Sequence, residues 1–114
     1  MAKFLLLMRG DQTGFMAMPK EEKKAVIQEH IDYSEKLEAM DKIVGGGGLN
    51  SFSVLLNKNG NNIDQKNYPF KGTKYQLSGF YIIEAADLNE ALELAKTCPA
   101  LAHGESVEVA EMGH

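Results

Sequence analysis

The chain has 114 residues, of which 44% are apolar and 25% are charged, and its formal net charge is −4. These values are typical of a single globular domain over residues 1–114, and the acidic balance disfavours nucleic-acid binding, which requires clustered cations. No stretch reaches the roughly 18 apolar residues of a membrane span, so we expect a soluble, cytoplasmic protein without a membrane partner.

The first part of the chain predicts a strand and a long helix. Residues 3–9 form a short apolar run, which predicts a strand buried on both faces. After a loop over residues 12–18, Pro19 suits the first turn of a helix because its missing N–H needs no partner there. We expect this helix to span residues 19–41. The side chains that helical spacing places on its buried face are Val26, His30, Tyr33, Leu37 and Met40.

Four consecutive glycines at positions 45–48 interrupt the apolar pattern. Glycine weakens the interior of a helix or strand, so we expect the chain to turn here or to approach another segment closely. Residues 52–57 predict a strand, and the Asn- and Gly-rich residues 58–62 predict a turn into a second strand over residues 63–66. The middle of the chain therefore predicts a β-hairpin.

The last third of the chain predicts a strand, a helix and a final strand. Residues 79–85 are rich in aromatic and β-branched side chains and predict a central strand. Asp87 and Glu90 have the spacing of a helix capping box, and Pro99 ends the helix that follows. Apolar and polar residues alternate over residues 106–110, which predicts a half-buried strand. The predicted buried face of the helix comprises Leu88, Ala91, Leu92 and Ala95.

This order of elements, β-α-β-β-α-β with an extra hairpin, predicts the α+β class and a ferredoxin-like fold. Such a fold places its helices on one face of an antiparallel sheet and leaves the other face open. An open apolar sheet face is normally covered, and in a chain of this size a second copy is the simplest cover. We therefore expect a homodimer.

Motifs that would define a reaction are absent from the sequence. It has no Cys-x-x-Cys, His-Glu-x-x-His or Gly-x-Ser-x-Gly motif and no phosphate-binding loop. His30 is the main candidate, because an imidazole titrates near neutral pH and the helix periodicity directs this one toward the sheet. The alternative is a structural histidine whose ring nitrogens find local partners. One inward histidine without a second ligand does not support haem or a metal, so we expect no cofactor.

The middle of the chain is its only cationic part, because residues 45–83 carry four lysines and one aspartate. Three of these lysines are interleaved with aromatic residues, an arrangement that could bind a small organic anion. A solvated loop, kept soluble by its lysines, is the simpler interpretation. The residues are Lys66, Lys71 and Lys74, with Tyr68, Phe70 and Tyr75.

Seven short motifs follow one another along nearly the whole chain: MAKFLLLMRG, Glu29-His30, the glycine turn ending at Leu49, Tyr68-Pro69-Phe70, Thr73-Lys74, residues 76–81 and residues 87–91. In this order and spacing they resemble the YCII-related superfamily, and specifically its DGPF branch. The resemblance implies a ferredoxin-like fold that dimerises sheet to sheet into an α/β barrel, with a cleft near the helix histidine.

Two positions depart from the pattern of the family. The Asp-Gly-Pro-Phe signature of the branch stands here as Asn-Tyr-Pro-Phe at residues 67–70, so the carboxylate and the glycine are missing. YCII-like enzymes pair the helix histidine with an aspartate just before a proline, and the matching position here is Cys98, before Pro99. Without that carboxylate, His30 lacks a partner that would fix its tautomer. Cys98 itself is either a small buried hydrophobe or a reactive thiol.

Two hypotheses from different classes follow. In the first, the protein is a YCII-like enzyme, or a degenerate one, in which His30 acts as general base on a small anionic organic substrate. Arg9 or Lys74 would offset the substrate charge, and Phe70 and Tyr81 would form apolar walls. In the second, it is a non-catalytic dimeric regulatory or interaction module, and the resemblance implies extracytoplasmic-function sigma factors as partners. The retained histidine favours the first hypothesis, and the missing aspartate favours the second.

Overall fold

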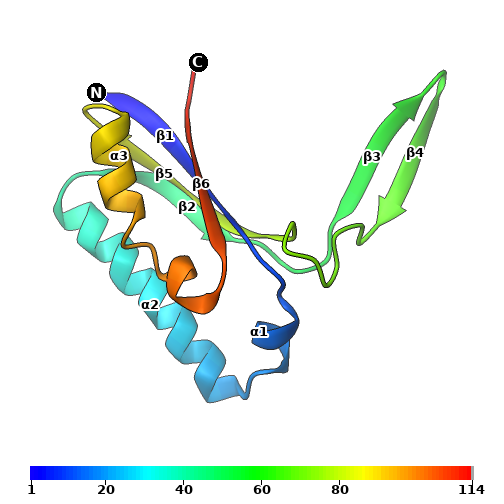
Figure 1. Ribbon diagram of the computed structural model, residues 1–114, viewed down its shortest axis with the longest axis horizontal. Helices are drawn as coiled ribbons and strands as arrows, with labels where there is room; N and C mark the ends of the chain where they lie inside the picture. Colours follow the sequence, from blue (N-terminus) through cyan, green and yellow to red (C-terminus); the bar gives the residue numbers. More distant parts are fainter. Residues whose placement is uncertain (114) are drawn as a thin grey trace.

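A four-stranded antiparallel sheet organises the chain in the computed structural model, which describes residues 1–113 (Figure 1). Its strands are β1 (Ala2–Arg9), β2 (Ile43–Gly48), β5 (Leu77–Ala85) and β6 (Ser106–Glu111), in the order β2-β5-β1-β6. The helices are α1 (Thr13–Ala17), α2 (Lys20–Ala39), α3 (Leu88–Ala95) and the 3-10 helix η1 (Pro99–His103). With the hairpin set aside, this is the strand order of a ferredoxin-like fold, so the predicted fold class is confirmed.

The core lies between one face of the sheet and the two longer helices, α2 and α3. Along β1 and β5 every second residue is buried there, as the two-residue period of a strand requires. Leu5 and Leu7, on the opposite face of β1, are only partly buried, so the prediction that this strand is buried on both faces is wrong for a single copy of the chain. The core side chains are Phe4, Leu6 and Met8 of β1, Tyr81, Ile83 and Ala85 of β5, Tyr33 and Leu37 of α2, and Ala91 and Ala95 of α3.

The long helix α2 confirms the predicted helix with small shifts at both ends. It begins directly after Pro19 and carries acidic side chains in its first turn, where they favour the positive end of the helix. Tyr33 and Leu37 are buried as predicted, whereas Met40 is 44% exposed because it lies just beyond the last helical residue. No helix within residues 1–113 is long and apolar enough to span a membrane.

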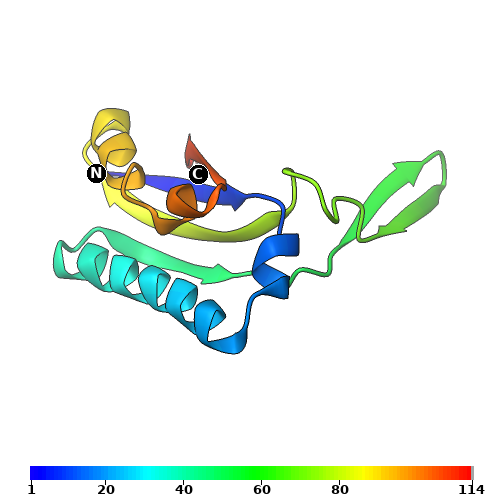
Figure 2. The same cartoon turned by 60° about the horizontal axis from the view of Figure 1, so that its bottom comes forward.

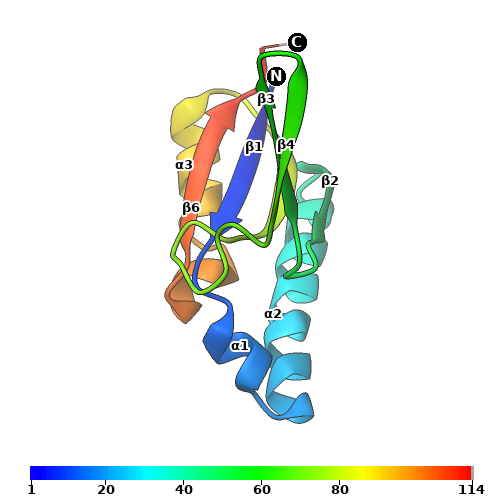
Figure 3. The same cartoon turned by 90° about the vertical axis from the view of Figure 1, so that its right-hand side faces the viewer.

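The predicted loop over residues 12–18 contains the short helix α1, which lies beside the N-terminal end of α2 (Figures 2 and 3). The Asp11 carboxylate accepts hydrogen bonds from the amide and the hydroxyl of Thr13, at 2.9 Å and 2.6 Å, at the start of this turn. A single helical turn is too short to produce an apolar period, so the sequence pattern does not reveal it.

The predicted hairpin is confirmed, although its first strand lies two residues later than predicted and its second strand extends one residue further at each end. Strand β3 (Val54–Asn59) pairs with β4 (Asn62–Asn67) around a turn in which Gly60 has a φ of 62°. Every residue of both strands is exposed, and the hairpin extends away from the rest of the molecule (Figures 1 and 2).

The glycine segment 45–48 does not turn, which corrects the sequence-based expectation. It continues β2, at the edge of the sheet, and pairs with β5. The alternative expectation, that the glycines approach another segment closely, is confirmed. A Cβ on Gly46 would lie 2.6 Å from the carbonyl oxygen of Phe80 and 3.0 Å from the Tyr81 ring. Glycine is therefore required at position 46 by the neighbouring strand.

Helix α3 confirms its predicted cap and half of its predicted buried face, since Ala91 and Ala95 are buried as predicted. The Asp87 carboxylate accepts a hydrogen bond from the Glu90 amide at 2.9 Å, but the Glu90 carboxylate accepts from Ala86 rather than from Asp87. Leu88 and Leu92, predicted to be buried, are 48% and 38% exposed, and the buried residues of the helix are alanines, with Leu94 packed against the core beside them. The helix is rotated so that its small side chains allow it to lie close to the sheet.

Replacing Gly46 by alanine is expected to destabilise the protein by about 1–3 kcal/mol, because the added methyl group would overlap a carbonyl oxygen of β5. Gly47→Ala is the matched control in the same strand. No atom lies within 4 Å of its added Cβ, so we expect its free energy of unfolding to change by at most about 1 kcal/mol. Urea unfolding followed by circular dichroism measures both variants. Equal destabilisation of the two would contradict a specific contact at Gly46.

Candidate functional site

The structure brings two of the predicted site residues together where α2 packs on β5. His30 Nδ1 and the Tyr81 hydroxyl oxygen are 2.7 Å apart, and the two rings are stacked with their centroids 6.0 Å apart. His30 is half-buried and Tyr81 is buried. Tyr81 was expected to form an apolar wall, but its hydroxyl is the hydrogen-bond partner of the histidine.

Two placements of the protons satisfy this contact. Burial raises the pKa of Tyr81 well above its ordinary value, so its hydroxyl keeps its proton near neutral pH. In one placement this hydroxyl donates to Nδ1, and Nε2 of the ring carries the proton. In the other, Nδ1–H donates to the tyrosine oxygen, and the hydroxyl donates to the carbonyl oxygen of His30, 3.4 Å away. Only the second placement leaves a lone pair on Nε2 to accept a proton from another molecule.

Burial also governs the charge of the histidine. Burial lowers the pKa of His30, and the neighbouring His103 lowers it further. The nearby carboxylates of Glu105 and Glu29 raise it, but burial is the largest effect. The carboxylates have partners of their own, since Glu105 accepts from Gln12 Nε2 at 3.0 Å and Glu29 lies 2.6 Å from His103 Nε2. The ring of His30 is therefore uncharged near neutral pH, which is the form a base requires.

Cys98 stands at the position to which the family resemblance assigns an orienting aspartate, and its thiol cannot replace a carboxylate. Its side chain is 2% exposed, and its sulfur lies 3.8 Å from the sulfur of Met8. Burial raises the pKa of the thiol, so it stays protonated near neutral pH. The structure therefore supports the interpretation of Cys98 as a small buried hydrophobic residue and not as a reactive thiol.

The predicted binding residues Arg9 and Phe70 line a cavity of about 550 Å³ at the base of the hairpin, the hairpin cavity. The guanidinium of Arg9 is also paired with Glu108, at an N–O distance of 2.6 Å. Lys74 does not line this cavity, and its ammonium lies 5.4 Å from the centroid of the Tyr75 ring. The remaining lining residues are Leu49, Asn50, Phe52, Ser53, Val54, Leu55, Pro69, Tyr75, Gln76 and Leu77.

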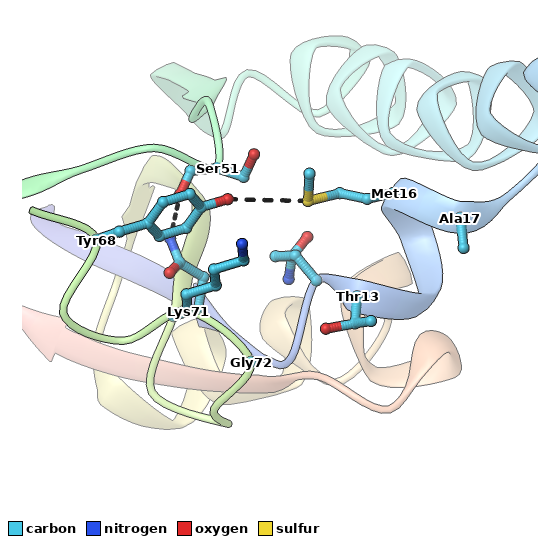
Figure 4. A pocket seen from close by; sticks show the side chains of 9 residues that line it. Thr13, Met16, Ala17, Ser51, Tyr68, Lys71 and Gly72 are labelled. Atoms are coloured by element: carbon cyan, nitrogen blue, oxygen red, sulfur yellow. Dashed lines mark hydrogen bonds between the residues drawn. The ribbon is translucent and has the colours of Figure 1, made fainter.

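A second cavity, of about 280 Å³, lies between helix α1 and the segment that follows the hairpin, and we call it the α1 cavity (Figure 4). Tyr68 and Met16 face each other across it, with 4.0 Å between the hydroxyl oxygen and the sulfur. None of the five predicted site residues lines it, and neither His30 nor Tyr81 lines either cavity. The remaining lining residues are Gln12, Thr13, Ala17, Ser51, Lys71, Gly72 and Gln76.

Sequence reasoning missed the two polar residues that link the histidine to the α1 cavity. Glu105 acts on the charge of His30, and its carboxylate accepts from Gln12, which lines the cavity. Gln12 and Glu105 are 93 positions apart and belong to no motif, so no local pattern could have found their contact. No group of three or more His, Cys, Asp or Glu side chains suited to a metal ion occurs within residues 1–113.

The fold and the family agree. The model of the YCII-related domain matches residues 2–113, and the chain therefore belongs to the YCII-related family. Among solved structures, the chain is similar to 5-chloro-2-hydroxyhydroquinone dehydrochlorinase from Burkholderia phenoliruptrix AC1100 in complex with 2,5-dihydroxybenzoquinone. The two are 23% identical with a TM-score of 0.56, over 98% of this chain and 94% of that chain, which shows a shared fold. No curated protein matches the chain.

The lowered pKa of His30 predicts a pH dependence of stability. As the pH falls below the ordinary histidine pKa of 6.5, the unfolded chain binds a proton at His30 that the folded chain does not. His30 therefore destabilises the folded state as the pH decreases from about 7 to 5. We expect His30→Gln to lose less unfolding free energy than the wild type over this range, measured by urea unfolding. An NMR titration of the His30 ring with a midpoint at or above 6.5 would contradict the dominance of burial.

Proposed function

We propose that the protein belongs to the DGPF branch of the family and binds a small hydroxylated organic molecule, on which His30 acts as general base. The observation that carries this proposal is the 2.7 Å contact between His30 Nδ1 and the Tyr81 hydroxyl. It holds the ring of an uncharged, half-buried histidine in one orientation. A positioned imidazole that is neutral at neutral pH is the typical acceptor of a proton from a hydroxyl group.

The proposed step is a proton transfer. Nε2 of His30 takes the proton of an acidic hydroxyl group, so that the O–H bond breaks, an N–H bond forms and the ligand becomes an oxyanion. Nδ1–H remains bonded to the Tyr81 oxygen, and Tyr81 serves as the partner that the family places at the Cys98 position. Glu105 and Glu29 favour the positive charge that the ring then carries.

The class of ligand is inferred from the similar solved structure. That enzyme is named for a chlorinated hydroxyhydroquinone, and its structure contains 2,5-dihydroxybenzoquinone. Ring hydroxyls of such quinones are acidic, and a neutral histidine can deprotonate them without a carboxylate partner. We therefore propose a hydroxylated aromatic or quinone as the substrate class. We also propose that Arg9 and Phe70 bind a ligand in the hairpin cavity, with Lys74 as a source of positive charge, at a site separate from the histidine, because neither His30 nor Tyr81 lines that cavity.

Binding of 2,5-dihydroxybenzoquinone tests the proposal, with affinity from calorimetry and ionisation of the ligand from its visible spectrum. We expect His30→Gln to weaken binding about tenfold or more at a pH where the free ligand is partly protonated, because the proton acceptor is lost. Tyr81→Phe should weaken it less, since the ring remains but its orientation is no longer fixed. The matched control is Tyr33→Phe, which removes another buried hydroxyl, one bonded to the Leu94 carbonyl at 2.6 Å. No binding by the wild type, or equal binding by all variants, would overturn the proposal.

The proposal includes a homodimer formed through the uncovered sheet face. On that face β1 contributes Leu5 and Leu7, and their antiparallel partners on β5 are Ile82 and Phe80. These four side chains are only partly buried in one copy, although they lie at the centre of the sheet. A second copy placed sheet to sheet would cover them and complete the α/β barrel that the family resemblance implies.

Ile82→Lys is expected to convert the dimer into a monomer, because it places a charge in the centre of the proposed interface. Ile27→Lys is the matched control, since Ile27 is 50% exposed on α2, away from the sheet. Sedimentation velocity of the wild type and both variants measures the association state, and circular dichroism verifies the fold. A monomeric wild type, or a dimeric Ile82→Lys protein, would contradict the proposed interface.

One observation favours a non-catalytic module as the second candidate function. The thiol of Cys98 is buried and protonated, and it stands where the family resemblance implies a carboxylate. A protein that binds no hydroxylated aromatic, and instead forms a stoichiometric complex with an extracytoplasmic-function sigma factor, would support this second function. Gel filtration of the two purified proteins is the corresponding measurement.

A further inference from the structure

Gln76, which lines both the α1 cavity and the hairpin cavity, carries a buried hydrogen-bond acceptor that no group of the described residues satisfies. Gln76 is 3% exposed, and its side-chain oxygen has no hydrogen-bond partner within residues 1–113. Its side-chain nitrogen donates to the carbonyl oxygens of Ser51 and Leu77, at 3.1 Å and 3.3 Å. Exchanging nitrogen and oxygen would place the oxygen against two carbonyl groups, so these contacts fix the orientation of the amide. A buried acceptor left unpaired is costly, and a donor from a bound molecule would remove that cost.

The α1 cavity also contains a cation. Lys71 lines it, and Figure 4 shows the lysine and the ring of Tyr68 on one side of the space, opposite Met16. The ammonium of Lys71 lies 5.1 Å from the centroid of the Tyr68 ring and belongs to no ion pair among the described residues. Its charge is therefore available to an anionic group of a ligand.

The walls and the size of the cavity limit the ligand further. Met16, Ala17 and the ring of Tyr68 supply apolar surface, and Tyr68 offers a flat face for stacking. The volume of about 280 Å³ is at the lower end of the range of small-molecule sites, which suits a compound with a single ring.

We propose that the α1 cavity binds a single-ring aromatic carboxylate that carries a hydroxyl group. The carboxylate pairs with Lys71, the ring packs against Tyr68 and Met16, and the hydroxyl donates to the side-chain oxygen of Gln76. This site goes beyond the proposed function, because neither His30 nor Tyr81 lines the cavity and binding there requires no proton transfer.

Calorimetry with 3-hydroxybenzoate and 4-hydroxybenzoate tests the site on the full chain. We expect at least one isomer to bind. The corresponding methoxybenzoate, which cannot donate to Gln76, and the hydroxybenzyl alcohol, which has no charge, should each bind about tenfold or more weakly. Failure of both acids to bind at millimolar concentration would overturn the proposal, and so would equal affinity for the methoxy compound.

Variants locate the ligand. Lys71→Gln should weaken binding about tenfold, and Lys66→Gln, which removes an equal charge from the exposed strand β4, should leave it within about twofold. Gln76→Leu should bind the hydroxybenzoate and the methoxybenzoate equally well. If this variant does not fold, the NMR signal of the Gln76 side-chain amide should shift when the wild type is titrated with the hydroxybenzoate. His30→Gln should bind as the wild type does. Loss of binding in His30→Gln would place the ligand at the histidine and overturn the separate site.

Discussion

The central position of β5 in the sheet is the constraint on which the candidate site depends. Because β5 pairs with β1 on one side and with β2 on the other, its side chains alternate between the two faces of the sheet. Tyr81 faces the helices and meets His30, whereas Phe80 and Ile82 face away from them. A shift of one residue in register would exchange the two sets of side chains. One pairing therefore determines both the histidine contact and the uncovered apolar face.

A tyrosine is a different partner for a histidine than the carboxylate that the family resemblance implies. A carboxylate accepts only, so it fixes the tautomer and stabilises the imidazolium. The Tyr81 hydroxyl can both donate and accept a hydrogen bond. It accepts from Nδ1–H of His30, which leaves Nε2 free to take a proton, only when its own proton is donated to the carbonyl oxygen of His30, 3.4 Å away. With no carboxylate in direct contact, burial dominates and the pKa of His30 is lowered.

The elements with local patterns could be predicted from the sequence, and those set by distant contacts could not. The helix start after Pro19, the burial of Tyr33 and Leu37 in α2, and the Asn- and Gly-rich turn of the hairpin follow from local patterns, and these predictions are confirmed. Whether the glycines at 45–48 turn or pair is decided by β5, and how α3 is rotated is decided by the space above the sheet. The candidate site likewise combines one feature set by a local pattern and one set by a distant contact. The inward direction of His30 could be predicted from periodicity, but its bond to Tyr81 depends on the position of β5 beneath α2.

The pairing of β1 with β6 has a consequence for the order in which the protein folds. Phe4 lies opposite Glu111 and Arg9 opposite Ser106, so one edge of the N-terminal strand is completed by the last strand of the chain. Contacts between such distant segments make folding slow relative to helical proteins, because a large loop must close before they form. On the ribosome, β1 is synthesised first and must wait with that edge unpaired until residue 111 has left the exit tunnel. The sheet is therefore completed only after β6 has been synthesised.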